Sequence, residues 1–205
     1  MQITTFITNL NHSLPMFLAM GAEATIELRD SMIIKKRLPK GYRLKALDSS
    51  IRADRTRAEA RIISESRRRG VPTPIIYDIE DFEITMEYID GQQVRDILTP
   101  DLSRRIGTVV GKLHSAGIIH GDLTTSNMIL HDNRIYLIDF GLAFYDSSVE
   151  ARGVDVHVLF QTFVSTHNDY EAMKAAFVEG YSQTFADAGP VLERVNEIKG
   201  RARYA

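Results

Sequence analysis

Residues 120–130 read HGDLTTSNMIL, and residues 135–143 read IYLIDFGLA; these two stretches decide the fold and most of the chemistry. Asp122 follows the apolar pair Ile118-Ile119, which predicts that its carboxylate lies in a loop and can reach a hydroxyl group or a water. Asn127 comes five residues later, just before a short apolar run. The first stretch therefore predicts a polar loop that leads into a strand.

Asp139 directly follows the apolar run Ile135–Ile138, so a short strand is expected to deliver its carboxylate, and Phe140-Gly141 allows a sharp turn. One carboxamide, from Asn127, and one carboxylate, from Asp139, suit Mg²⁺, which takes oxygen ligands and keeps several waters. Such a metal bridges ATP phosphates and offsets charge during transfer. Asp122 is then left to orient the acceptor. Loop aspartates that merely cap helices or turns are the alternative.

The bulk composition is that of an ordinary globular protein. The chain has 205 residues, of which 44% are hydrophobic and 25% charged. It contains no cysteine, which excludes disulfides and thiolate metal sites. The longest apolar stretch, near Leu14–Ala22, is too short to span a bilayer, and the N-terminus lacks the layout of a signal peptide. These features predict a soluble, cytoplasmic protein without a membrane segment.

The charge is distributed unevenly around a net value of −2. The segment Lys35–Arg69 holds 13 of the 25 basic residues and only four acids, which gives it +9. A solvated helix face is the ordinary explanation of such a run. An excess this large also fits an anionic partner, either RNA or an acidic protein surface.

Periodicity divides the chain into a strand-rich part and a helix-rich part, with a switch near residue 89. The run Thr25–Arg37 reads as strand, and a hairpin is expected around the turn Glu80-Asp81. Gly70 and Pro72 mark the end of a helix. The expected helical ranges are 51–69, 101–117 and most of 154–198, and the expected later strands are 128–130 and 135–138.

The two motifs, taken together, resemble the catalytic loop and the Asp-Phe-Gly motif of the protein-kinase superfamily, in the same order and with similar spacing. The resemblance implies an α+β, bilobal protein-kinase-like fold. A small β-rich N-lobe would occupy residues 1–88, and a compact helical C-lobe without an extended activation segment would occupy residues 89–205. It also implies ATP and Mg²⁺ as cofactors.

A protein kinase needs a lysine on its third strand to hold the α- and β-phosphates and a helix glutamate to hold that lysine. Lys35 and Glu59 fill these positions. Lys36 is the competitor of Lys35, but alternation along a strand sends neighbouring side chains to opposite faces, so only one of them can enter the cleft.

Three further kinase features can be placed by the same resemblance. The phosphate loop corresponds to Gly21-Ala22-Glu23-Ala24, and the hinge that meets adenine corresponds to Met86, Glu87 and Ile89 within Met86–Ile89. Asp155 lies in an apolar helix, where a carboxylate is costly unless it is paired. The matching aspartate of kinases braces the backbone of the catalytic loop.

Several features depart from a regulated protein kinase. The phosphate loop has a single glycine, Gly121 replaces the arginine that pairs with a phosphorylated activation loop, and Thr124 replaces a lysine. No Ala-Pro-Glu motif follows, and little chain remains for a protein-substrate platform. Gly121 suggests that a partner protein, rather than phosphorylation of the activation loop, controls the activity.

These departures, together with GAEA, KKRLPKGYR, EAR, GVPTP, HGDLTTSNMI, IDFGL and KGRARY, resemble the small atypical kinase/ATPase subunit of the KEOPS complex, the PRPK family. The resemblance runs from about Gly21 to Arg203. It implies ATP hydrolysis and serine/threonine phosphorylation, and a role in adding threonylcarbamoyl to adenosine in tRNA. Partners would be the Kae-type transferase subunit and other KEOPS subunits, with tRNA contacted through Lys35–Arg69 and the C-terminal tail. The initial methionine suggests a free-standing subunit.

Two other readings remain open. A small-molecule kinase of the aminoglycoside or choline type also uses His-Gly-Asp, but it usually carries a large helical insertion for which this chain has no space. A non-catalytic ATP-binding scaffold would have no chemical reason to keep Lys35, Glu59, Asp122, Asn127 and Asp139 together.

Overall fold

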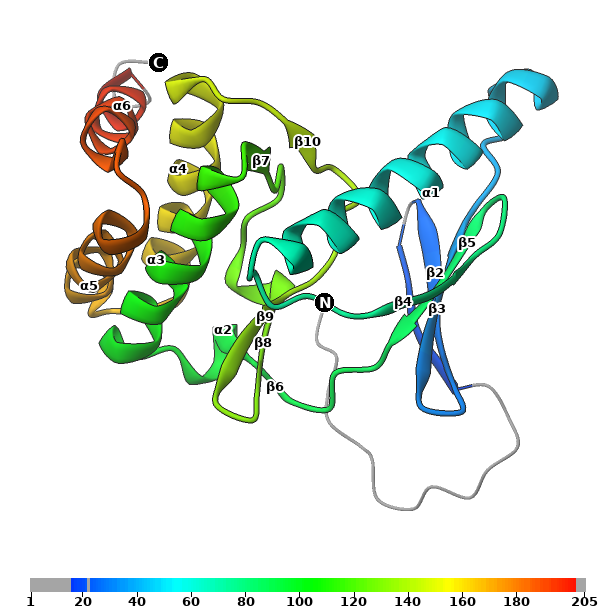
Figure 1. Ribbon diagram of the computed structural model, residues 1–205, viewed down its shortest axis with the longest axis horizontal. Helices are drawn as coiled ribbons and strands as arrows, with labels where there is room; N and C mark the ends of the chain where they lie inside the picture. Colours follow the sequence, from blue (N-terminus) through cyan, green and yellow to red (C-terminus); the bar gives the residue numbers. More distant parts are fainter. Residues whose placement is uncertain (1–15, 22, 202–205) are drawn as a thin grey trace. The chain divides into compact units, whose positions relative to one another are not determined.

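The computed structural model describes residues 16–21 and 23–201, and these residues form two compact units (Figure 1). The first unit contains the residues up to Arg61 together with Pro74–Tyr88. The second contains Ile62–Thr73 and the chain from Ile89 onward. The predicted lobes 1–88 and 89–205 remain a prediction; by packing, the segment 62–73 groups with the later part of the chain. Ala22 and the end of the basic tail, including Arg203, lie outside the described residues.

The first unit is built on an antiparallel five-stranded sheet with the strand order β1-β2-β3-β5-β4. The predicted single run Thr25–Arg37 is wrong, because Asp30 and Ser31, with φ of 50° and 61°, form a two-residue turn between two strands. A turn of this kind matches the twist of a hairpin. The strands are β1 (Met16–Met20), β2 (Ala24–Arg29), β3 (Met32–Arg37), β4 (Ile76–Ile79) and β5 (Glu83–Glu87).

Helix α1 (Lys45–Arg68) begins six residues before the predicted start at Ile51 and ends before Gly70 (φ 80°), as expected. Its residues up to Arg61 pack within the first unit. One cluster of the core there joins Ala60 from α1 with Ile84 and Met86 from β5, flanked by Ile33 and Ile76. Polar side chains outnumber apolar ones along α1, and several of them form ion pairs with the sheet and with the loop before β2.

The second unit is mainly helical. Its helix α3 (Pro100–Ser115) begins with Thr99, whose side chain accepts a hydrogen bond from the main-chain N–H of Leu102, and with proline in the first turn. The apolar residues Leu102, Ile106, Val110 and Leu113, which recur at helical spacing along α3, are buried. The other helices are α2 (Val94–Ile97), α4 (Val149–Thr166), α5 (Tyr170–Thr184) and α6 (Ala188–Arg201), with a 3₁₀ turn η1 at Thr125–Asn127.

Helix α5 packs along α3, and α6 packs along α4 (Figure 1). The α3–α5 contact is unusually close: a Cβ on Gly107 would lie 2.2 Å from the Phe177 carbonyl oxygen, and one on Gly180 would lie 1.8 Å from that of Arg104. Glycine is therefore required at both positions of this helix pair. Among the described residues, no helix combines the length and the apolar character needed to cross a membrane.

Two small sheets complete the second unit and carry the motif loops. The predicted strands around Met128 and Ile135 pair as a hairpin, and β6 lies beside the first of them. The strands are β6 (Gln92–Gln93), β8 (Met128–His131) and β9 (Arg134–Leu137) in one sheet, and β7 (Ile118–Ile119) with β10 (Phe144–Tyr145) in the other.

Candidate active site

Lys35 and Glu59 meet inside the first unit. The Nζ of Lys35, on β3, donates to Oε1 of Glu59, on α1, at 2.6 Å, and the two residues are 8% and 2% exposed. Lys36 is exposed and lies 3.5 Å from Glu83, on the other side of the strand. The alternation of a strand therefore brings Lys35, and not Lys36, to the helix glutamate.

The second carboxylate oxygen of Glu59 accepts a hydrogen bond from Nη2 of Arg37, a residue that is only 5% exposed. The sequence analysis did not single out Arg37. Strand periodicity contains the missing signal, since Arg37 lies two residues after Lys35 and so faces the same side of β3. One buried carboxylate thus holds two buried cations.

The predicted phosphate loop connects β1 and β2. Within it, the N–H of Gly21 donates to the carbonyl of Ala24 at 2.9 Å. The carboxylate of Glu23 turns to α1 and lies 2.7 Å from Arg55. The hydrogen bond from Arg55 lowers the pKa of Glu23 below its ordinary value. Ala22 lies outside the described residues, so only three of the four predicted loop residues can be placed.

The predicted hinge residues lie at and after the end of β5. Met86 is buried in the core of the first unit, and Ile89 is also buried. Glu87 makes two hydrogen bonds with Ile75: its N–H donates to the Ile75 carbonyl at 2.8 Å, and its Oε2 accepts from the Ile75 N–H at 3.0 Å. The Glu87 side chain and N–H thus serve the strand pairing.

In the second unit, Asp122 and Asn127 are joined directly. The Nδ2 of Asn127 donates to the main-chain oxygen of Asp122 at 3.0 Å and to its Oδ2 at 2.9 Å. Because both acceptors are oxygens, the carboxamide orientation is fixed, and its Oδ1 points away from Asp122. Both side chains are half-buried. Asn127 therefore orients Asp122 and keeps its own oxygen available for a cation.

Asp139 lies at the same end of the β8–β9 hairpin as Asn127. The two segments are tied by a hydrogen bond from the N–H of Ile138 to the carbonyl of Asn127 at 3.0 Å. Asp139 is exposed and has φ of 60°, in the left-handed region, and its Oδ1 accepts from the N–H of Gly141 at 3.3 Å. The predicted pair of oxygen ligands is thus delivered from one edge of one small sheet.

This donor set fits Mg²⁺ better than a metal that needs a full protein cage. Across residues 16–21 and 23–201, no three His, Asp or Glu side chains gather into a metal-binding group. Mg²⁺ is commonly held by one or two protein oxygens, with waters and substrate phosphates completing its shell. Asn127 and Asp139 are the two residues predicted to supply such oxygens.

Asp155 of α4 holds the backbone of the catalytic loop, residues 120–127, as the kinase resemblance implied. Its Oδ2 accepts the N–H of His120 at 2.8 Å, and its Oδ1 accepts the N–H of Gly121 at 3.0 Å. Gly121 has φ of 78°, and a Cβ there would lie 2.3 Å from the carbonyl oxygen of Leu142. The backbone itself therefore requires glycine where a regulated kinase has arginine.

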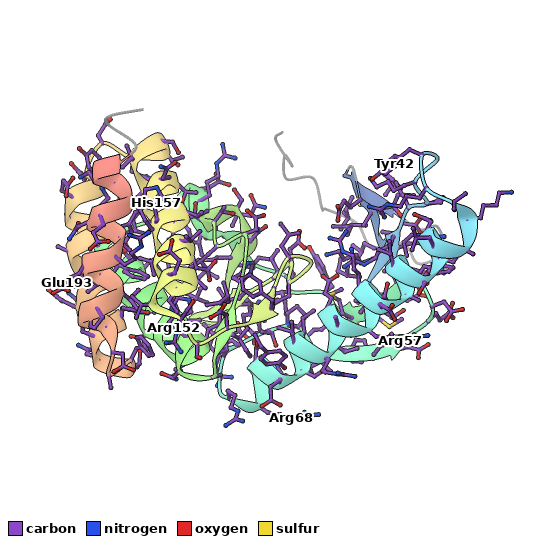
Figure 2. The ribbon with its side chains drawn as sticks, turned by 90° about the horizontal axis from the view of Figure 1, so that it is seen from above. Tyr42, Arg57, Arg68, Arg152, His157 and Glu193 are labelled. Carbon is purple, nitrogen blue, oxygen red and sulfur yellow. The ribbon has the colours of Figure 1, made fainter. Side chains whose placement is uncertain are left out.

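Two residues that the sequence analysis missed extend this brace. The Nε2 of His114 lies 3.2 Å from Asp155, and its Nδ1 lies 2.8 Å from the hydroxyl of Tyr181. Burial lowers the pKa of His114 and outweighs the opposing effect of Asp155. The contact is therefore a hydrogen bond from a neutral imidazole and not an ion pair. Arg152, labelled on α4 in Figure 2, donates to the His114 carbonyl at 3.1 Å.

His120 links the two motifs. Its Nε2 donates to the carbonyl of Ile138 at 3.1 Å, and its ring lies 4.8 Å from that of Phe140. Burial lowers the pKa of His120, so its ring is neutral as well. The neutral side chain of His120, which precedes Gly121, thus connects the first motif to Ile138, which precedes Asp139 in the second motif.

A cavity of about 770 Å³ lies elsewhere in the second unit, between α4, α5 and α6. His157, labelled in Figure 2, and Lys174 are among its polar residues, and the remaining wall is mostly apolar. It contains none of the residues predicted to bind nucleotide or metal.

The chain is similar to known proteins over most of its length. The sequence profile of the RIO domain matches residues 35–175. A protein of Archaeoglobus fulgidus, named probable serine/threonine-protein kinase BUD32 homolog, is 48% identical over 187 residues, which cover 90% of this chain and 94% of that protein.

A longer protein of Methanosarcina barkeri, named probable bifunctional tRNA threonylcarbamoyladenosine biosynthesis protein, is 59% identical over 190 residues, which cover 90% of this chain and 35% of that protein. The chain thus spans about a third of the length of such bifunctional relatives. Among solved structures, the Rio2 kinase–ADP/Mg²⁺–phosphoaspartate complex of Chaetomium thermophilum has a TM-score of 0.61 at 13% identity and covers 91% of this chain and 70% of that one. The predicted α+β, protein-kinase-like fold is confirmed.

Proposed function

Because the chain belongs to the RIO-domain family and is a homologue of BUD32-type proteins, we propose that it is an Mg-ATP-dependent atypical serine/threonine kinase and ATPase that acts in the threonylcarbamoyladenosine modification of tRNA. The observation that carries the proposal is the position of the profile match. It extends over residues 35–175 and includes Lys35, Glu59, Asp122, Asn127 and Asp139.

In this proposal Lys35 binds the α- and β-phosphates of ATP, and Glu59 holds Lys35 in place. The loop Gly21–Ala24, which has a single glycine, covers the phosphates, and the backbone around Met86–Ile89 contacts adenine. Asn127 and Asp139 hold Mg²⁺ through Asn127 Oδ1 and the Asp139 carboxylate. When bound, the metal would offset the negative charge that develops during phosphoryl transfer.

Asp122 orients the acceptor hydroxyl or water. Its Oδ2 is held by Asn127 at 2.9 Å, which leaves the other carboxylate oxygen to accept a hydrogen bond from the acceptor. Thr124 cannot supply the cation that a lysine would place near the moving phosphoryl group. Water is therefore as suitable an acceptor as a protein hydroxyl, in keeping with ATPase activity.

The partners proposed are the Kae-type transferase subunit, the other KEOPS subunits and tRNA, in the cytoplasm. The printed names of the relatives connect them with threonylcarbamoyladenosine biosynthesis. Within the basic segment, the guanidinium groups of Arg37, Arg52 and Arg55 are engaged by carboxylates. Arg61, Arg67 and Arg68 are more exposed, although Arg67 donates to the Thr73 carbonyl and Arg68 pairs with Glu65, and their exposure makes them better placed for tRNA phosphates.

The experiment follows the γ-phosphate of radiolabelled Mg-ATP with the protein alone, and then with the Kae-type partner and tRNA. We expect label to move mainly to free phosphate, to be stimulated by the partner or tRNA, and to be lost in Asp139→Ala. Transfer of the label to serine or threonine, with or without the partner and tRNA, would favour a protein that acts primarily as a protein kinase. Turnover that Asp139→Ala leaves intact would contradict the site, and rapid transfer to an aminoglycoside or choline would favour the small-molecule alternative.

A further inference from the structure

Glu59 is shared between two cations that approach from one strand. Lys35 Nζ donates to Oε1 at 2.6 Å, while Arg37 Nη2 donates to Oε2. The three side chains are 10%, 5% and 2% exposed for Lys35, Arg37 and Glu59. Since both carboxylate oxygens are bound, the Glu59 side chain cannot rotate away from Lys35 without breaking the bond to Arg37.

Both bonds to Glu59 are charge-assisted and largely shielded from water, because all three side chains are at most 10% exposed. Loss of Arg37 would leave one oxygen of a buried carboxylate without this donor, and that is costly in a site that excludes water.

Arg37 also connects the phosphate loop with α1. Its Nη1 lies 3.8 Å from the Glu23 carboxylate, which itself lies 2.7 Å from Arg55 of α1. One helical turn earlier, the guanidinium of Arg52 lies 3.9 Å from the centre of the Phe82 ring. The helix is therefore held against the sheet at several points along the turns that precede Glu59.

We propose that Arg37 is a positioning residue: it holds the Glu59 carboxylate so that the Lys35–Glu59 pair is in place before nucleotide binds. This inference rests on the proposed function and adds to it a means of regulation. A helix glutamate bound on both oxygens does not need a phosphorylated activation loop to bring it into place.

The first test measures Mg-ATP hydrolysis by Arg37→Met, which keeps the length of the side chain but removes its charge. We expect KM for ATP to rise roughly tenfold and kcat to fall several-fold, because the charge-assisted hydrogen bond that holds Glu59 in place is lost. Arg37→Lys should recover part of KM. The control is Arg29→Met, on the exposed part of β2, which should leave both constants unchanged.

If Arg37 had only a structural role, Arg37→Met would lower the amount of folded protein and leave KM for ATP unaffected. That outcome for Arg37→Met would overturn the proposal, as would a KM that Arg37→Lys does not recover at all.

The second test is a double-mutant cycle with Glu59→Gln. If Arg37 acts through Glu59, adding Arg37→Met to Glu59→Gln should cause no further rise in KM. Glu59→Gln alone leaves two buried cations without their carboxylate, so Arg37→Met should also raise the melting temperature of that variant. Additive effects on KM together with a further fall in melting temperature would contradict the proposal.

A measurement that does not depend on enzyme activity separates a failure of the proposed function from a failure of the inference about Arg37. If the wild-type protein shows no turnover that depends on Lys35, the proposed function fails. Nitrogen-15 NMR of the Lys35 ammonium then still decides the role of Arg37: Arg37→Met should shift and broaden its signal because the carboxylate of Glu59 is released, and Glu59→Gln, which removes that carboxylate, should do the same. An unchanged Lys35 signal in Arg37→Met would overturn the inference, whatever the ATPase activity.

Discussion

The residues proposed to bind phosphate and those proposed to bind metal are held by different forces. In the first unit, Lys35 is positioned by ion pairs around Glu59. In the second unit, the catalytic loop is positioned by hydrogen bonds that run from Tyr181 through the neutral His114 to Asp155. The contrast follows from the elements available: a small sheet with a polar helix in one unit, and a closely packed set of helices in the other.

This difference has a physical consequence for each region. Helix α1 is mostly polar and meets the sheet of the first unit through charge pairs, whose strength depends on their exposure. A well-packed helical core can afford buried polar networks, provided that every member is satisfied. The first region should therefore tolerate changes in its exposed charges, while the second should be sensitive to loss of any one partner.

The largest expected effect is that of Asp155→Ala. The substitution leaves the N–H groups of His120 and Gly121 and the ring of His114 without their acceptor inside the second unit. We expect the free energy of unfolding to fall by about 3–5 kcal/mol. Urea unfolding followed by circular dichroism measures it. Asp101→Ala, on the exposed face of α3, should change it by less than about 0.5 kcal/mol.

An equal loss of unfolding free energy in Asp155→Ala and Asp101→Ala would mean that the hydrogen bonds of Asp155 do not specially stabilise the second unit. The contrast between the two units would then not hold.

The next effect is that of Gly121→Ala, which combines an unfavourable φ of 78° with a Cβ 2.3 Å from the Leu142 carbonyl oxygen. We expect a loss of about 2–3 kcal/mol in the free energy of unfolding. Gly117→Ala is the matched variant, since it has φ of 69° but open space around the Cβ, and should cost only about 1 kcal/mol. Similar losses in the two variants would show that the contact with Leu142 yields without cost.

The two units should also respond differently to acid. Burial lowers the pKa of both His114 and His120 in the folded state, so the unfolded chain binds more protons below its own histidine pKa of about 6.5. Stability is then complete above pH 6.5 and decreases as the pH falls, by up to about 1.4 kcal/mol per pH unit for each histidine. Unfolding curves between pH 7 and pH 5 measure this slope.

Replacing the half-buried His157 by glutamine should leave most of the slope in place. A slope of zero, or stability that increases as the pH falls, would contradict the assignment of neutral rings.

The smallest effect concerns the exposed charges of the first unit. The Glu23 side chain is 48% exposed, so its pair with Arg55 is screened by solvent. Glu23→Gln should lower the free energy of unfolding by about 0.5 kcal/mol at low salt and by almost nothing in 1 M NaCl. A loss above about 2 kcal/mol that persists in high salt would place this pair with the buried group around Glu59.

Much of the fold could be predicted because local patterns were consistent with the tertiary structure. The apolar stripe of α3 and the glycine after α1 marked their helices well. The hairpin β2–β3 was missed because its turn residues, Asp30-Ser31, lack the glycine that usually supplies a positive φ. The helical range 154–198 was correct in composition, but it did not show where α4, α5 and α6 end.

The candidate site was predictable where its residues lie close together in sequence. Asp122 and Asn127 are five residues apart, and their hydrogen bond agrees with their grouping in one motif. His114 and Tyr181 are 67 residues apart and belong to different helices, so only packing brings them together. Sequence alone offered no reason to select them from other buried polar side chains.

Asp139 keeps its carboxylate at the end of β9 by adopting a φ of 60°, which costs a non-glycine residue about 1 kcal/mol. Glycine at this position would relieve the cost but would remove the oxygen ligand. The protein thus gives up some heat resistance at the residue proposed to bind metal. A library selected only for survival at high temperature should enrich Asp139→Gly, while a library selected for ATP turnover should eliminate it.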